Sequence, residues 1–142
     1  MKILLPVDGS PSSTRAVRHV IRHWSGKDSS PRASLVLLYV DPPLIERVSR
    51  YLTPEDLTRF HADRMKTTVR PARSALRKAG VPFEERHEIG DPAAHIVKLA
   101  TKLRCDLVAM GSHGRGAFLS AVLGSVVMKV LSQSKVPVLV VR

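Results

Sequence analysis

The chain alternates between short continuous apolar runs and longer segments in which apolar residues recur every three or four positions. Runs of the first kind are typical of strands buried on both faces, and the second spacing is typical of amphipathic helices. The run at residues 81–89 is mostly polar, so this strand is expected nearer a sheet edge. The five predicted strands cover residues 2–7, 33–40, 81–89, 106–110 and 136–142.

The segments between these runs show helical periodicity, and several open with a capping residue followed by proline. The clearest start is Thr53-Pro54-Glu55-Asp56, from which a helix is expected to run to Ala79 and stop at Gly80. Pro71 lies inside that helix and should kink it or split it in two. The other helices are expected after Ser10-Pro11, after Asp91-Pro92 and over residues 122–132, with a short helical turn before residue 52.

Strands that alternate with helices along the whole chain predict a single-domain, doubly wound α/β fold with a five-stranded parallel sheet and helices on both faces. A length of 142 residues fits one domain over residues 1–142. In such sheets ligands bind outside the carboxyl ends of the strands, where the winding reverses. The strand ends to inspect are therefore Val7-Asp8-Gly9, Val40-Asp41 and Met110-Gly111.

The third of these strand ends opens a glycine-rich stretch, Gly111-Ser-His-Gly114-Arg-Gly116, which is followed by Gly124-Ser125. Glycines let backbone N–H groups approach a ligand closely, and a helix that begins after them adds its positive dipole end. The stretch therefore predicts phosphate binding, with a nucleotide as the owner of the phosphates and a plain strand-to-helix turn as the alternative. It lacks the Gly-Lys-Ser/Thr ending of a Walker A loop and the spacing of the dinucleotide fingerprint.

The charge balance is strongly basic, with 23 lysines and arginines against 12 acidic residues and a formal net charge of +11. Such a charge favours nucleic acid or anionic surfaces as partners. The cations are scattered through the helices rather than grouped, so solvated helix faces are the alternative explanation. A single cysteine, Cys105, excludes an intramolecular disulfide and is expected to be a buried, inert thiol. No apolar stretch fits a signal peptide or a membrane span, which predicts a cytoplasmic protein.

Several of these segments match one known pattern. Gly111, Gly114, Gly124 and Ser125 fit the motif glycine, two residues, glycine, nine residues, glycine, serine or threonine. Together with Ile-Leu-Leu-Pro-Val-Asp-Gly-Ser at 3–10, Gly-Asp-Pro-Ala at 90–93, Leu-Gly-Ser-Val at 123–126 and the apolar end at 136–141, they make the whole chain resemble the ATP-binding branch of the universal stress protein family.

This resemblance implies a Rossmann-like fold of the adenine nucleotide alpha hydrolase type. It implies that the chain binds ATP with Mg²⁺ as a regulatory ligand in stress response. A homodimer formed through the last strand, residues 136–142, is also implied. In the family pattern Asp8 reaches the ribose, Val40 approaches the adenine through its backbone, and Gly124, Ser125 and Val126 hold the phosphate tail. The full candidate set is Pro6, Val7, Asp8, Val40, Met110, Gly111, His113, Gly114, Arg115, Gly124, Ser125 and Val126.

Val127-Met128 departs from the family, whose members often carry a small or polar residue and then an acidic one there. Without a hydroxyl at position 127, a weaker hold on the terminal phosphate is expected. Arg115 is a better candidate than His113 for a phosphate contact, because guanidinium groups bind phosphate in a bidentate manner. Asp8 and Asp41 could hold a magnesium ion through the nucleotide.

Catalysis has little support, since no nucleophile–base pair and no metal-binding spacing of histidines is visible. Slow or negligible ATP hydrolysis is therefore expected. Three alternatives stay open at this point: the family branch that does not bind nucleotide, a true ATPase, and a protein that binds nucleic acid or anionic surfaces through its basic face. The motif glycines argue against the first, and a steep loss of binding with salt would favour the last.

Overall fold

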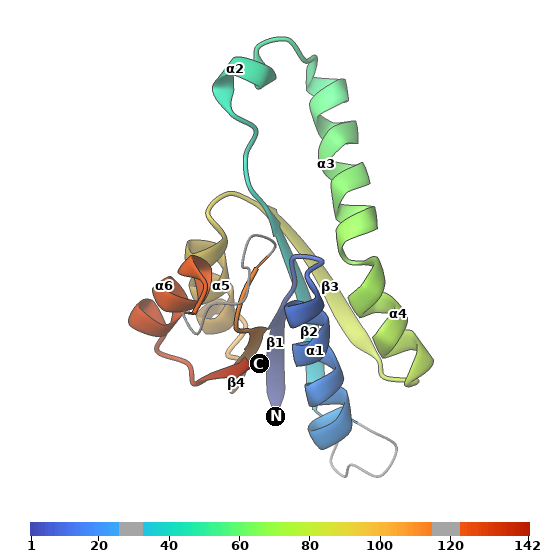
Figure 1. The fold of residues 1–142 in the computed structure, drawn as a ribbon, viewed down its shortest axis with the longest axis vertical. Helices are drawn as coiled ribbons and strands as arrows, with labels where there is room; N and C mark the ends of the chain where they lie inside the picture. The colour runs from blue at the N-terminus through green and yellow to red at the C-terminus, as the bar shows by residue number, and fades with distance from the viewer. Residues whose placement is uncertain (26–32, 115–122) are drawn as a thin grey trace.

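A computed structural model describes residues 1–25, 33–114 and 123–142 of the chain. Its sheet has five strands in the order β3-β2-β1-β4-β5, and every neighbouring pair runs parallel (Figure 1). This confirms the expected doubly wound α/β fold, with the polar strand at one edge. The strands are β1 (Lys2–Pro6), β2 (Ser34–Asp41), β3 (Phe83–Ile89), β4 (Leu107–Gly111) and β5 (Val138–Val141).

Helices cover both faces of this sheet (Figure 1). Ile3 and Leu5 of β1 belong to the core cluster beneath α1 and α4, whereas Leu4 belongs to the cluster beneath α5 and α6. Successive side chains of a strand point to opposite faces, so a continuous apolar run supplies both cores at once. The covering helices are α1 (Pro11–Val20), the π-helical turn η1 (Ile21–Ser25), α4 (Arg70–Lys78), α5 (Pro92–Lys102) and α6 (Ser125–Gln133).

The segment after β2 carries α2 (Glu46–Ser49) and α3 (Pro54–Thr68), which extend beyond the carboxyl ends of the strands (Figure 1). The helix expected over 54–79 is split in two at Val69, which confirms the expectation from Pro71. A proline fits the first turn of a helix but not its interior, and Pro71 lies in the first turn of α4. The second half ends before Gly80, whose φ of +65° suits a glycine C-cap.

Several element boundaries differ from the expectation. The last helix begins at Ser125 rather than at residue 122, and Gly124 is its N-cap, with an extended φ of −63° and ψ of 153°. The strand expected to end at Met110 includes Gly111, and β2 includes Asp41. Residue 122 itself lies outside the described residues.

Two further expectations can be compared with the structure. Cys105 is buried, and burial raises the pKa of its thiol, which fits an inert side chain. Among the helices of the described residues, none has the length and apolar content needed to cross a bilayer.

The edge strand β3 is tied to α4 by an ion pair that allows a pH test. Arg73 Nη2 lies 2.6 Å from Glu85 Oε1, and Arg73 Nε donates to Glu85 Oε2 at 3.0 Å. The Arg73 guanidinium holds the pKa of the Glu85 carboxyl below its ordinary value of 4.5, against the opposing effect of burial. Because the folded-state pKa is lowered, this pair stabilises the fold above the unfolded pKa and is lost as the pH falls through the folded one.

Replacing Glu85 by glutamine should therefore lower the free energy of unfolding at neutral pH by about 1 kcal/mol. The difference from the unmodified chain should shrink in urea titrations below about pH 4. Glu84→Gln is the matched control, since Glu84 is exposed and its ion pair with Arg86 is half-exposed. If the loss of unfolding free energy in Glu85→Gln did not change with pH, it would contradict stabilisation by the Arg73–Glu85 ion pair.

Candidate functional site

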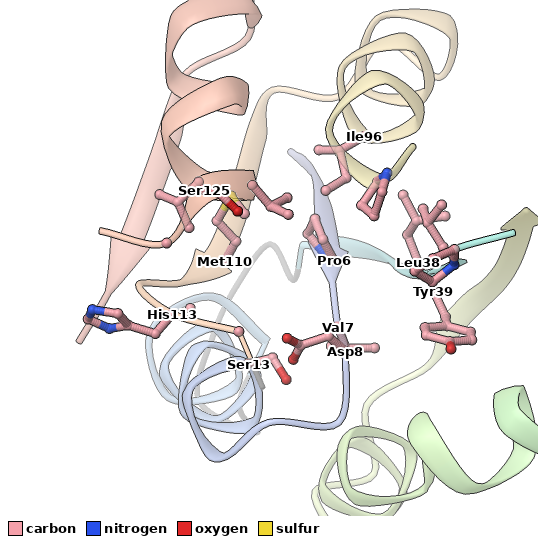
Figure 2. Close-up of a pocket in the computed structure, with 18 of the residues that line it drawn as sticks. Pro6, Val7, Asp8, Ser13, Leu38, Tyr39, Ile96, Met110, His113 and Ser125 are labelled. Carbon is pink, nitrogen blue, oxygen red and sulfur yellow. The ribbon is translucent and has the colours of Figure 1, made fainter. Parts of the chain in front are cut away.

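A cavity of about 540 Å³ opens at the carboxyl ends of β1, β2 and β4, where the winding of the sheet reverses (Figure 2). This is the place that the strand order predicts for a ligand. The motif-derived residues converge on it although they come from distant parts of the chain. Those that line it are Pro6, Val7, Asp8, Val40, Met110, Gly111, His113, Gly114, Gly124, Ser125 and Val126.

Arg115, the remaining candidate, lies outside the described residues. The cavity also has lining residues that the sequence reasoning missed. Most of them belong to segments already expected beside the site, and only Arg64, from α3, had no local signal that pointed to it. The missed residues are Ser13, Leu38, Tyr39, Pro42, Arg64, Pro92 and Ile96, while Val127, which the sequence placed near the terminal phosphate, lines the cavity as well.

One end of the cavity is apolar, with Leu38 and Val40 from β2 and Ile96 from α5. The Val7 N–H donates to the Leu38 carbonyl at 2.8 Å, so Leu38 presents its backbone groups to β1. Alternate residues of a strand face the same neighbour, and Val40 therefore faces this side as well. Because β1 ends at Pro6, it does not extend as far as Val40. The Val40 N–H and C=O are therefore placed to hydrogen-bond a flat ligand with a polar edge.

Asp8 stands in the middle of the site, with Leu38 and Tyr39 on one side and Ser125 and His113 on the other (Figure 2). The turn after β1 fixes its position, because Asp8 Oδ1 accepts a hydrogen bond of 3.0 Å from the Ser10 N–H. Its other oxygen closely approaches Gly114, where an added Cβ would lie 2.9 Å from Asp8 Oδ2. A glycine at 114 thus leaves room for this carboxylate.

The opposite end of the cavity is the start of α6. Gly124 supplies no side-chain cap, and the first residues of the helix, Ser125 and Val126, line the cavity. Uncapped N–H groups of a first helical turn attract anions, and the helix dipole adds to this attraction. The Gly124 N–H donates to the Ser112 carbonyl at 2.9 Å, which holds the helix start beside β4.

The polar side chains around this helix start are held in place by their neighbours. Ser112 Oγ lies 2.9 Å from His113 Nδ1, and the His113 backbone N–H donates to Ser12 Oγ at 3.4 Å. Figure 2 shows the His113 ring at the edge of the site. The cavity thus joins an apolar end, one carboxylate and an anion-attracting helix start.

Asp41 does not play the part expected from the sequence. It is absent from the cavity lining, and its carboxylate is 3% exposed. Oδ1 accepts from the Tyr39 hydroxyl at 2.8 Å and lies 3.4 Å from Arg64 Nε, while Oδ2 is 2.5 Å from His61 Nδ1. With these partners, and buried outside the cavity lining, Asp41 organises the surrounding structure and is not placed to hold a metal ion in the cavity.

Within the described parts of the chain, no group of three or more histidine, cysteine or acidic side chains is arranged to hold a metal ion. A magnesium ion at this site would therefore depend on ligand oxygens, with Asp8 as the one acidic residue among the described residues that line the cavity.

A family model, curated proteins and solved structures that resemble this chain point to one family. The model of the universal stress protein family matches residues 1–142. A universal stress protein from Thermus aquaticus is 30% identical over 141 residues, which cover 99% of this chain and 97% of that protein. The solved structure of protein MJ0577 from Methanocaldococcus jannaschii has a TM-score of 0.80 and 29% identity, with 99% and 94% of the two chains covered. A universal stress protein solved in complex with cAMP has a TM-score of 0.70 and 27% identity, covering 100% and 97%.

Proposed function

The chain belongs to the universal stress protein family, and from this premise we propose that it binds an adenine nucleotide as a regulatory ligand in stress response. The observation that carries the proposal is the convergence of the motif-derived residues on one cavity with an apolar end, a central carboxylate and an uncapped helix start. The relative solved in complex with cAMP supports an adenine ligand. The proposal covers one domain over residues 1–142 that acts in the cytoplasm.

The three parts of the cavity match the three parts of such a ligand. Leu38 and Ile96 would enclose the adenine, while the Val40 backbone would bind its polar edge. Asp8, which lines the cavity, would accept hydrogen bonds from the ribose hydroxyls, and a glycine at 114 leaves room for its carboxylate. A nucleotide-sized ligand is compatible with a cavity of about 540 Å³.

The phosphates would lie at the start of α6, against Ser125 and Val126. We propose ATP with Mg²⁺ as the ligand, the ion being held mainly by the phosphates. Val127 lines the cavity and offers no hydroxyl, so the terminal phosphate should add little affinity. The described lining contains no arrangement that we can assign to a nucleophile and its base, and we therefore propose binding with at most slow hydrolysis.

Replacing Asp8 by asparagine tests the proposal directly. The amide can still accept from the Ser10 N–H, so the turn is kept, but the charge-assisted bonds to the ribose are lost. We expect calorimetry to show a roughly 10- to 100-fold weaker affinity for ATP, since a hydrogen bond to a charged group contributes about 1.5–3 kcal/mol. AMP should lose the same factor, because the change lies at the ribose.

Asp63→Asn is the matched control, since Asp63 is exposed on α3 and the same charge is removed. Its affinity should equal that of the unmodified chain. No binding of ATP or AMP to folded, nucleotide-free protein would refute the proposed function, and equal losses in both variants would refute the role of Asp8.

A homodimer through the last strand is part of the same proposal. β5 ends the order of the sheet, and its four residues are all half-buried in the single chain. An edge strand with apolar side chains can pair with its copy. Sedimentation equilibrium that shows only a monomer at micromolar concentration would refute this assembly.

A further inference from the structure

A second cavity is lined by residues of α1, η1 and α4 and lies away from the carboxyl ends of the strands. Figure 1 shows α1 and α4 on one face of the sheet. We call it the α1–α4 groove. Arg18, Arg22 and Lys78 stand along it as exposed cations. Its floor is made of smaller or apolar groups, among them Ile21, Pro71 and Ala75. It shares no lining residue with the cavity at Asp8.

The charge around this groove has one sign. α1 and η1 contribute three arginines, α4 contributes three arginines and a lysine, and none of these elements contains an acidic residue. Arg73 is neutralised by Glu85. Among residues 1–25, 33–114 and 123–142, no ion pair joins Arg18, Arg22 or Lys78 to a carboxylate. The groove is therefore a place where a polyanion would be attracted.

Three aromatic rings come from the same elements as the two arginines, since His19 follows Arg18 in α1, and His23 and Trp24 follow Arg22 in η1. The ring centroid of His19 is 4.4 Å from that of His23 and 5.9 Å from that of Trp24. His23 is exposed, and the other two rings are partly so. Burial lowers the pKa of His19, and the neighbouring His23 and Arg22 lower it further. Rings of this kind offer faces on which unpaired bases can stack.

We propose that the α1–α4 groove and the adjoining rings bind single-stranded nucleic acid, with phosphates on Arg18, Arg22 and Lys78 and a base on His23. Arg18 and Arg22 are one helical turn apart, about 6 Å along the axis, and can therefore contact neighbouring phosphates. A cationic groove combined with stacking rings is the arrangement by which proteins hold single strands without sequence preference.

Two other polyanions fit the structure less well. A duplex hides its base faces, so it would leave the ring cluster unused. A membrane surface favours apolar side chains that project beside the cations, but the exposed Ile45, Val48 and Tyr51 lie around α2, far from the groove (Figure 1). The concave groove and its neighbouring rings therefore favour a flexible single strand.

The test is fluorescence anisotropy with a labelled, unstructured 20-nucleotide DNA and its RNA counterpart. Three phosphate contacts on a single strand predict a slope of about −2 for the logarithm of affinity against the logarithm of salt concentration. The triple variant Arg18→Gln, Arg22→Gln, Lys78→Gln should lose roughly tenfold or more in affinity near 0.1 M salt and most of this slope.

The matched control is Lys98→Gln, Lys102→Gln, Lys135→Gln, which removes three exposed lysines outside the groove. Both triples lower the formal net charge from +11 to +8. The control should keep its affinity within about threefold, since none of its positions contacts the strand in our proposal. Equal losses in the two triples would show diffuse attraction and overturn the proposal.

His23→Ala separates stacking from charge. Loss of one stacked base should weaken binding roughly fivefold or more while the salt slope stays unchanged. Circular dichroism and thermal unfolding of each variant confirm that the fold is kept. Duplex DNA bound as tightly as the single strand, anionic lipid vesicles bound in its place, or no binding by the unmodified chain would each overturn the proposal.

Discussion

Replacing the buried Asp41 by alanine is expected to lower the free energy of unfolding by about 3–5 kcal/mol. The carboxylate is 3% exposed and accepts from or pairs with Tyr39, His61 and Arg64. Removing it leaves a hydroxyl, an imidazole and a guanidinium without the anion around which they are arranged. The free-energy cost of leaving a buried charge without its partner is far larger than the net free energy that the pair contributed.

Urea unfolding of the variant measures this loss. Asp63→Ala is the control, because it deletes an exposed carboxylate from the same helix that supplies His61 and Arg64; its effect should stay within about 0.5 kcal/mol. A loss below about 1 kcal/mol for Asp41→Ala would contradict the central position of this carboxylate.

The Asp41 cluster also shows where sequence reasoning stopped. Asp41 follows a strand in the sequence pattern, and the rule that ligands bind at strand ends made it a candidate magnesium ligand. Its role is decided instead by His61 and Arg64, which lie on α3, two elements after β2 in the chain. They reach Asp41 only because α3 packs beside β2. No local periodicity encodes that approach, so the same rule placed Asp8 in the cavity and misjudged Asp41.

The fold itself was predictable because its signals are local. Continuous apolar runs predicted β1, β2, β4 and β5, and a mostly polar run predicted the edge strand β3. Proline after a capping residue predicted the starts of α1, α3 and α5. The start of α6 was placed too early because the apolar pattern continues through Leu123. That residue packs partly buried against the core beneath α6 without being helical. Burial produces the same apolar signal in a loop as in a helix.

The candidate site was predictable for a further reason, since the spacing of the motif fixes both the loop and the helix start that follows it. The spacing does not show that its glycines serve different purposes. Gly111 is buried against the backbone of α1, and Gly124 is a helix N-cap whose φ and ψ any residue can adopt. Only the structure separates a glycine required by packing from one that leaves a helix start open to a ligand.

Gly111→Ala should therefore destabilise the fold by about 3 kcal/mol, at the upper end of the cost of overpacking. A Cβ at this position would lie 2.5 Å from the Ser12 carbonyl carbon and 2.7 Å from its oxygen, and backbone atoms at the start of α1 cannot rotate away. Gly124→Ala is the matched control, because among the described residues the nearest non-neighbouring atom to its Cβ, the His113 Cα, would be 3.4 Å away. We expect the control to change the free energy of unfolding by less than about 1 kcal/mol in urea titrations. Equal losses of unfolding free energy in the two variants would contradict this distinction between Gly111 and Gly124. A Gly111→Ala variant as stable as the unmodified chain would mean that α1 does not pack against the end of β4.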